Sequence, residues 1–226
     1  MGNPFVYIWR SFRNLIYPPK CVLCQKVLVR SETDLCSTCR VEMPDFVLSR
    51  KHIAHVSGWT ALWYYKGYAR DSVLRYKFGR RRYYRLIFGR LLAMRVLTDL
   101  GQDFDLVTWV TPHWRRKVRK PFDHGRALAK AVAKELELPM VRTLTKSTYT
   151  AQQAGLGTST QRRGNLSGAF KGCKPQRFQN KRILLVDDIV TTGSTAEECA
   201  KTLLAEGAQA VSLAAVAATE KKQNPA

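Results

Sequence analysis

The segment from residue 187 to residue 195 has the side chains best suited to holding a phosphorylated sugar. Two adjacent carboxylates, Asp187 and Asp188, precede a segment rich in hydroxyls that contains one glycine. Backbone N–H groups of such a segment can wrap an anion, and a helix that follows adds its positive end. Carboxylates accept hydrogen bonds from vicinal hydroxyls and can help to hold a hydrated Mg²⁺ ion. The pattern indicates a site for a ribose 5-phosphate, with these candidates: Asp187, Asp188, Thr191, Thr192, Gly193, Ser194 and Thr195.

The elements on either side of this motif must position it. Residues 182–186 form an apolar run too short for a helix, so we expect a buried strand that ends at the acids. Behind the motif, apolar residues recur at helical spacing as far as Leu204. We expect Ser194 or Thr195 to cap this helix and Gly207 to end it.

From Val186 to Thr195 the sequence resembles, without a gap, the phosphoribosyl pyrophosphate (PRPP) loop of type I phosphoribosyltransferases. The alternative is an ordinary strand-turn-helix, but two exposed acids would then have no packing role. In purine-salvage members of that group, an aspartate three residues after the acidic pair is the expected base. Here Thr191 stands at that place, and a threonine cannot be a general base near neutral pH. The motif therefore supports binding of PRPP, with Mg²⁺, better than it supports transfer to a purine.

Four of the six cysteines form two pairs separated by eleven residues: Cys21, Cys24, Cys36 and Cys39. Two residues between partners let each pair form a tight knuckle, so that four thiolates can reach one Zn²⁺ ion and leave no place for water. Such a site is structural, and it can fold a segment too small for a core of its own. Disulfides are the alternative, but no secretory signal is recognisable. Cys199 lies on the apolar face of the helix after the motif, which favours a packing role.

The formal net charge is +21, from 38 basic and 17 acidic residues. This excess attracts polyanions such as nucleic acid, PRPP or an anionic membrane surface, or it serves only as a solvated surface. Arginines interleaved with tyrosines suit single-stranded nucleic acid, since cations meet phosphates while rings stack on bases. The alternative places these arginines in water and Tyr83 and Tyr84 in the core. The candidates for contact with DNA are Arg80, Arg81, Arg82, Tyr83 and Arg85.

A second apolar run, residues 106–112, ends at a proline and leads into a basic segment. A pyrophosphate bound opposite the ribose phosphate would need such charge at the end of a neighbouring strand. The polar stretch 146–168 reads as a long loop that closes over the ligand or, alternatively, as an unstructured linker. His124 could titrate near the site, although a surface or capping role is the commoner one. The candidates in these two segments are His113, Arg115, Arg116, Thr150, Gln153 and Arg162.

Strands that end in breakers alternate with amphipathic helices, which predicts an α/β domain with a mostly parallel sheet and helices on both faces. Further strands are expected at residues 59–65 and 211–217, and helices from Asp71, over residues 86–96 and over residues 125–138. We assign the chain as an amphipathic segment, a zinc module, an α/β domain and a polar tail. Their boundaries are 1–17, 18–45, 46–220 and 221–226. No apolar run approaches the roughly 20 residues that span a bilayer, and a cytoplasmic location is the simplest reading.

As a whole the chain resembles the ComF family, whose members carry a short zinc module ahead of a phosphoribosyltransferase-like domain. The matches include residues 15–21 ahead of the first knuckle, Leu74 with Lys77 and Phe78, Thr150 with Gln153 and Leu156, and Asn165 with residues 168–170. Residues 120–124 depart from the family's Arg-Gly-Phe-Asn-Gln run, which weakens a pyrophosphate role there.

The resemblance implies a cytoplasmic role in DNA uptake during natural transformation. It also implies handling of single-stranded DNA with an uptake helicase and recombination-mediator proteins as partners. The alternatives are an active phosphoribosyltransferase of nucleotide or nucleoside metabolism with an unknown acceptor, and a zinc-containing scaffold. Removal of zinc is expected to unfold the small module and leave the larger domain standing.

Overall fold

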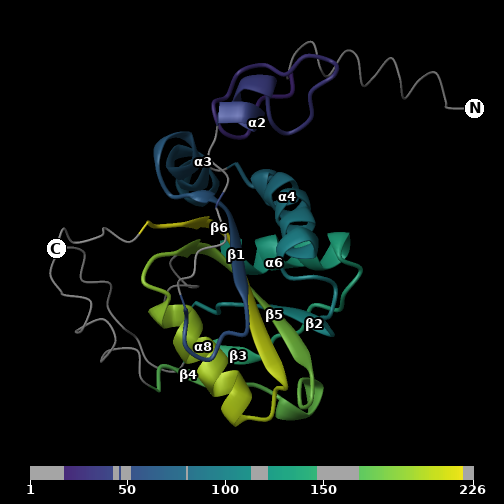
Figure 1. The fold of residues 1–226 in the computed structure, drawn as a ribbon, viewed down its shortest axis with the longest axis vertical. Helices are drawn as coiled ribbons and strands as arrows, with labels where there is room; N and C mark the ends of the chain where they lie inside the picture. Colours follow the sequence, from purple (N-terminus) through teal and green to yellow (C-terminus); the bar gives the residue numbers. More distant parts are fainter. Residues whose placement is uncertain are drawn as a thin grey trace, which may run out of the picture.

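A computed structural model describes residues 18–42, 46, 52–79, 81–112, 122–146 and 168–220. Four parallel strands form the central sheet in the order β1-β6-β5-β2 (Figure 1). The order places the first and last strands of the described chain side by side and puts β5 and β6 at the centre. The strands are β1 (Trp59–Tyr64), β2 (Leu106–Trp109), β5 (Arg182–Val190) and β6 (Ala210–Ala218). The predicted parallel sheet is confirmed.

Helices cover both faces of this sheet, as parallel strands require. α3 (Gly67–Phe78), α4 (Tyr84–Asp99) and α6 (His124–Glu135) pack on one face, and α8 (Ser194–Ala205) packs on the other. In β5, Leu184 and Val186 belong to the first cluster, whereas Ile183 and Leu185 belong to the second. All four side chains are fully buried, which explains why this strand reads as a continuous apolar run. The smaller elements are α2 (Ser37–Glu42), β3 (Leu144–Lys146), β4 (Phe170–Gly172) and the 3₁₀ turn η1 (Pro175–Arg177).

The cysteine-bearing segment packs on α3 and α4 at one end of the molecule (Figure 1). Val22 and Leu23, the two residues inside the first knuckle, are fully buried. They belong to the same cluster as Tyr76 of α3 and Tyr84 of α4. The module and the larger domain therefore share one core. The expectation that the larger domain stands without zinc stays a prediction, and the shared core favours the opposite outcome, because loss of the knuckle would expose part of that core.

Three of the differences from the expected element boundaries concern β5, α8 and α3. β5 does not stop at the acids but continues to Val190, because Ile189 and Val190 still pair with Ala217 and Ala218 of β6. α8 begins at Ser194 with Gly193 as its N-cap, so neither Ser194 nor Thr195 caps it. α3 begins at Gly67 rather than at Asp71.

β3 and β4 form an antiparallel pair that the sequence did not predict. Leu144 pairs with Gly172 and Lys146 pairs with Phe170, so the pair joins the two sides of the polar stretch expected to be a loop. With three residues each, the strands are too short to show periodicity. Within the described part of the chain, no helix combines the length and the apolar character needed to cross a membrane.

Candidate functional site

The four paired cysteines meet at one point. Their sulfur atoms all lie within 4.8 Å of one another, and Cys24 Sγ is 3.6 Å from Cys36 Sγ. Zn–S bonds of about 2.3 Å in a tetrahedron would separate the sulfurs by about 3.8 Å, so the cluster fits one Zn²⁺ ion. Four protein thiolates complete the coordination of zinc. The predicted structural zinc site on Cys21, Cys24, Cys36 and Cys39 is thus supported, and a site of this kind offers no position for substrate.

Backbone hydrogen bonds shape the knuckles. The N–H of Cys21 donates to the carbonyl of Lys26 over 2.8 Å, and the N–H of Gln25 donates to the carbonyl of Cys21 over 3.0 Å. Gln25 has a φ of 70°, which turns the chain sharply after the second cysteine. In the second knuckle the N–H of Cys39 donates to Cys36 Sγ over 3.4 Å. The spacing of two residues thus produces the tight loops that zinc requires.

The first knuckle docks on α3 through its own carbonyl groups. Ser72 Oγ donates to the carbonyl of Val22 over 2.7 Å, and the Arg75 guanidinium donates to the carbonyls of Val22 and Leu23. Ser72 is fully buried, so its hydroxyl needs this partner. Gln25 Nε2 also donates to the Tyr84 hydroxyl of α4 over 2.6 Å. These contacts fix the zinc loops against two helices of the larger domain.

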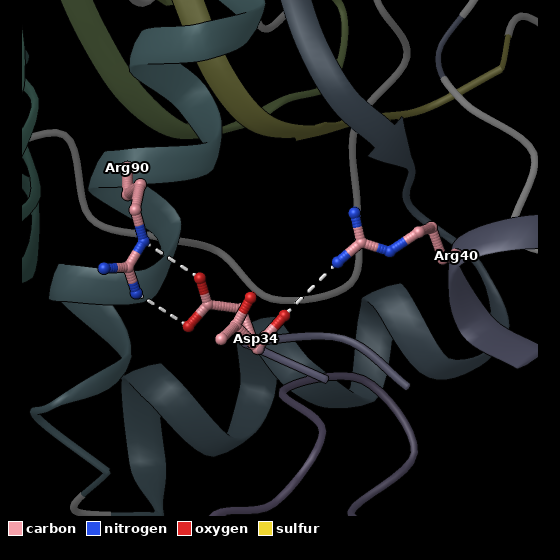
Figure 2. A network of polar contacts seen from close by, with 4 residues as sticks. Asp34, Arg40 and Arg90 are labelled. Carbon is pink, nitrogen blue, oxygen red and sulfur yellow. Dashed lines mark hydrogen bonds and ion pairs between the residues drawn. The ribbon is translucent and has the colours of Figure 1, made fainter. Parts of the chain in front are cut away.

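An ion pair fastens the opposite side of the module to α4 (Figure 2). The Arg90 guanidinium donates to both carboxylate oxygens of Asp34, over 2.9 and 2.7 Å. Asp34 has a φ of 64°, and its carbonyl accepts the N–H of Val22 over 2.9 Å. Arg40 of α2 donates to the carbonyl of Thr33, the residue before Asp34, over 3.4 Å. Asp34 therefore joins the turn before the second knuckle to both the first knuckle and α4.

The predicted phosphate loop lies between β5 and α8. Gly193 has a φ of 88°, and a Cβ placed on it would lie 3.1 Å from the Ile53 side chain, so both backbone and space favour glycine here. Thr192 Oγ1 lies 2.9 Å from Ser194 Oγ and accepts the N–H of Ser194 over 3.3 Å. Thr191 and Thr192 are exposed, whereas Ser194 is buried. The loop thus presents hydroxyls and the first turn of α8 at one end of the sheet.

The two acids lie within β5 and do not share an environment. Strict alternation would put residue 189 on the same side as Leu185, yet Ile189 packs in the cluster of Val186. The change of side falls at Asp187 and Asp188. The N–H of Asp188 donates to Asp187 Oδ1 over 2.8 Å, and Asp188 Oδ1 lies 2.8 Å from Lys77 Nζ of α3.

Electrostatics separate these two carboxyls further. Burial raises the pKa of Asp187 to about 7, and the charge of Asp188 adds to the rise while the Lys77 ammonium opposes it. A carboxyl with that pKa is partly protonated at neutral pH and can donate as well as accept a hydrogen bond. Asp188 is the member of the pair that contacts a cation. Lys77 is a residue of this site that our sequence reasoning missed, although it belongs to the motif that resembles ComF.

The fit of Mg²⁺ to this acid pair can be judged from the Lys77 contact. A divalent ion binds carboxylate oxygens at about 2.0–2.1 Å and keeps several of its waters. An ammonium at 2.8 Å from Asp188 Oδ1 already supplies positive charge there and would repel a second cation. Asp187 is a poor second ligand, because burial favours its protonated form. The residues present do not fit direct coordination of Mg²⁺ by both acids.

His124 begins α6 near the acids but does not cap it. The cap is Asp123, whose Oδ1 accepts the N–H of Arg126 over 2.9 Å. The Tyr76 hydroxyl donates to the carbonyl of His124 over 2.7 Å, and the rings of Tyr76 and Phe122 lie edge-on to the imidazole. Burial lowers the pKa of His124, so its imidazole is neutral near pH 7. Packing accounts for this histidine.

Comparisons with known proteins agree with both halves of this description. The phosphoribosyl transferase domain model matches residues 121–226, and the double zinc ribbon domain model matches residues 12–51. The DNA utilization protein YhgH of Escherichia coli strain K12 is 30% identical over 224 residues, which cover 87% of this chain and 96% of that protein. Competence protein F of Haemophilus influenzae is 32% identical over 98 residues, 42% of each chain. The chain belongs to the ComF family.

Solved structures resemble this ComF-family chain in fold alone. Glutamine PRPP amidotransferase from B. subtilis is 19% identical with a TM-score of 0.44. The match covers 63% of this chain and 30% of that chain.

The arginine–tyrosine run of this family member lies between α3 and α4. Arg81, Arg82 and Tyr83 are exposed, whereas the Tyr84 ring is fully buried, so the two tyrosines divide between surface and core. The Arg82 guanidinium lies over the Phe122 ring, 4.7 Å from its centroid. Arg85 is partly buried, and its guanidinium donates to the carbonyl of Arg82 over 2.7 Å. Two arginines and one ring of the predicted DNA-binding set thus face solvent.

The remaining candidates fall outside the described residues. These are Arg80 of the basic run and all six pyrophosphate and loop candidates, namely His113, Arg115, Arg116, Thr150, Gln153 and Arg162. The amphipathic segment 1–17 and the polar tail 221–226 lie outside them as well.

Proposed function

We propose that this ComF-family chain binds PRPP or a related ribose 5-phosphate at the loop after β5 and acts in DNA uptake. The observation that carries the proposal is the loop at Gly193. Its left-handed φ of 88° lets the chain turn directly from β5 into α8. The 12-residue helix that begins directly after this glycine offers the backbone N–H groups of its first turn and its positive end to an anion.

The side chains around this turn suit a phosphate. The N-cap Gly193 has no side chain to cap the first turn of α8, and the N–H of Ser194 reaches Thr192 Oγ1 over a long 3.3 Å that an anion could replace. Thr192 and Ser194 add hydroxyls that can donate to phosphate oxygens. Asp187 and Asp188 lie a few residues earlier and are the proposed acceptors for the ribose hydroxyls. Thr191 and Thr195 complete the proposed site.

Binding without turnover is the form we favour. Thr191 stands where a base is expected in purine-salvage phosphoribosyltransferases, and its hydroxyl cannot accept a proton near pH 7. The carbonyl of Thr191 also accepts a hydrogen bond from the Thr219 hydroxyl over 3.1 Å. The alternative is an active phosphoribosyltransferase of nucleotide or nucleoside metabolism. A scaffold without a working sugar-phosphate site is the weaker third reading.

The DNA part of the proposal rests on relatives and on charge. The relatives are named a DNA utilization protein and a competence protein. With a net charge of +21, the chain attracts nucleic acid in the cytoplasm. Exposed Arg81, Arg82 and Tyr83 offer cations and a ring to a single strand. An uptake helicase and recombination mediators are the proposed protein partners.

Calorimetry with PRPP tests the sugar-phosphate site. We expect the parent chain to bind PRPP and Gly193→Ala to lose about tenfold or more in affinity, because an alanine is strained at this φ and meets Ile53. Gly101→Ala is the matched control, since Gly101 also has a positive φ, of 81°, but an added Cβ there meets nothing within 4 Å. Absence of binding by the parent, or equal losses in both variants, would refute the site.

Pyrophosphate release separates binding from catalysis. The parent chain is incubated with PRPP and, in turn, with purines, pyrimidines, glutamine and ammonia. We expect binding of PRPP without release of pyrophosphate above the uncatalysed rate. Release that depends on one acceptor would instead establish the enzyme and name its nucleophile.

The salt dependence of binding tests the DNA surface. Affinity for a single strand should fall with rising salt, with a slope of roughly 0.7 per phosphate neutralised. Arg81→Ala with Arg82→Ala should lower that slope. The matched control is Lys130→Ala with Lys134→Ala, which removes the same charge from exposed positions of α6. Equal slopes in the two double variants would show that only the overall charge matters.

A further inference from the structure

Lys77 is held in place next to the acid pair by contacts of its neighbours on α3. Arg75, two residues earlier, donates to the carbonyls of the first zinc knuckle. Tyr76 is fully buried, and its hydroxyl donates to the carbonyl of His124 over 2.7 Å. These two contacts tie the last turn of α3 both to the zinc knuckle and to the start of α6. Lys77 therefore reaches Asp188 from a helix end that is anchored at two places.

The ion pair between Lys77 and Asp188 is shielded from solvent. The distance from Lys77 Nζ to Asp188 Oδ1 is 2.8 Å, and the two side chains are 24% and 19% exposed. By comparison, Lys66 at the start of the same helix pairs with Glu220 over 2.9 Å with exposures of 56% and 53%. A charge-assisted hydrogen bond is stronger when it is partly removed from water. The pair at the acids is the less exposed of the two.

This pair can serve a vicinal diol by itself. One carboxylate offers about four lone-pair positions, so Asp188 can still accept hydrogen bonds from sugar hydroxyls while Lys77 is bound. The ammonium has three donors, and those not used by Asp188 can point to hydroxyl oxygens. Among the described residues, Asp187 and His124 are further titratable groups on which this ammonium acts. The Lys77 ammonium thus supplies the positive charge that a divalent ion would otherwise provide, and the Asp188 carboxylate supplies the acceptor for the hydroxyls.

We propose that Lys77 is the resident cation of this site, so that the site takes a ribose 5-phosphate without Mg²⁺ at the acid pair. The proposal rests on the proposed function, because it concerns the same site. It also explains why the acid pair does not suit Mg²⁺, because the lysine already supplies the positive charge there. The ligand class is a 5-phosphorylated ribose recognised through its phosphate and its hydroxyls, with a lysine in place of a metal.

Calorimetry with ribose 5-phosphate tests this role, since that probe has no pyrophosphate to bring Mg²⁺ of its own. The buffer is freed of divalent ions over a chelating resin before protein is added, so that zinc stays on the cysteines. We expect the affinity of the parent chain to change by less than about twofold when millimolar Mg²⁺ is added. This arm needs no variant, and an increase of about tenfold with Mg²⁺ would overturn the proposal.

Two variants complete the test. Lys77→Met should bind ribose 5-phosphate about tenfold more weakly and should regain affinity when Mg²⁺ is added. Lys66→Met removes the same charge from the other end of α3 and should bind like the parent. If the parent and Lys77→Met bind equally and respond equally to Mg²⁺, the inference is wrong although the site binds its ligand. If the parent binds neither ribose 5-phosphate nor PRPP, the proposed function fails and the inference fails with it.

Discussion

The zinc module and the sugar-phosphate loop represent two different ways of building a binding site. In the zinc module, four like ligands come from a short stretch of chain and their sulfurs meet within 4.8 Å. In the loop, the acids of β5 are matched by a cation from α3, more than a hundred residues earlier in the chain. The first site is complete in local sequence, whereas the second depends on the tertiary fold. Spacing therefore identifies the zinc ligands but not the lysine.

The two regions are nevertheless joined by one helix. Ser72 and Arg75 of α3 hold the carbonyls of the first knuckle, and Tyr76 and Lys77 of the same helix contact His124 and Asp188. These contacts lie within six consecutive residues of α3. We therefore expect zinc to stabilise the larger domain as well as its own loops.

Loss of zinc should have the largest effect and tests whether the two regions are separable. Cys36→Ser removes a buried ligand, and structural zinc contributes about 10–16 kcal/mol of apparent binding energy in small zinc domains. We expect loss of bound zinc and a large fall in the melting temperature of the whole domain, followed by tryptophan fluorescence, to which Trp63 in the shared core contributes. Cys173→Ser, outside the cluster, is the control. An unchanged fluorescence transition in the zinc-free variant would show two independent units.

Truncation of the shared core should have the next largest effect. Leu23 lies between the first two zinc ligands but is fully buried against the larger domain. Leu23→Ala should lower the free energy of unfolding by about 2–5 kcal/mol, as for other buried leucines. Val29→Ala, in the same module but with 61% of the side chain exposed, should change it by less than about 0.5 kcal/mol. Urea denaturation measures both, and equal changes would contradict the shared core.

The residues that the sequence predicted well are those whose role is local. The zinc ligands follow from spacing, and the strands β1 and β6 follow from short apolar runs because both faces of the sheet are covered. The course of β5 past the acids could not be predicted, since Asp187 and Asp188 read as a strand end while their pairing depends on β6. Gly193 as the N-cap was missed because Ser194 and Thr195 are the usual capping types. Lys77 was missed because its sequence motif does not indicate that the lysine contacts Asp188.

The acid pair should make the stability of the chain fall as pH rises, which is the opposite of the zinc thiolates, since these lose their metal as pH falls. The pKa of Asp187 is raised to about 7 in the folded state from a usual value of 3.8. The folded chain therefore keeps a proton that the unfolded chain releases between about pH 4 and pH 7, so stability falls as pH rises through this window, by at most about 1.4 kcal/mol per pH unit. Asp187→Asn should remove this fall. Urea midpoints between about pH 5.5 and 8 measure it, and the control is Asp103→Asn, whose side chain is 86% exposed.

The ion pair between Asp34 and Arg90 should have the smallest effect on stability. It lies at the rim of the interface between the zinc module and the larger domain. The contact is bidentate, but the Arg90 side chain is 49% exposed, and pairs of this kind contribute about 0.2–1 kcal/mol. A double-mutant cycle of Asp34→Asn and Arg90→Leu measures the coupling, since asparagine tolerates the left-handed φ of residue 34. We expect coupling within that range, decreasing as salt is added. Coupling of several kcal/mol that ignores salt would mean that the interface depends on this pair rather than on Val22 and Leu23 in the buried core.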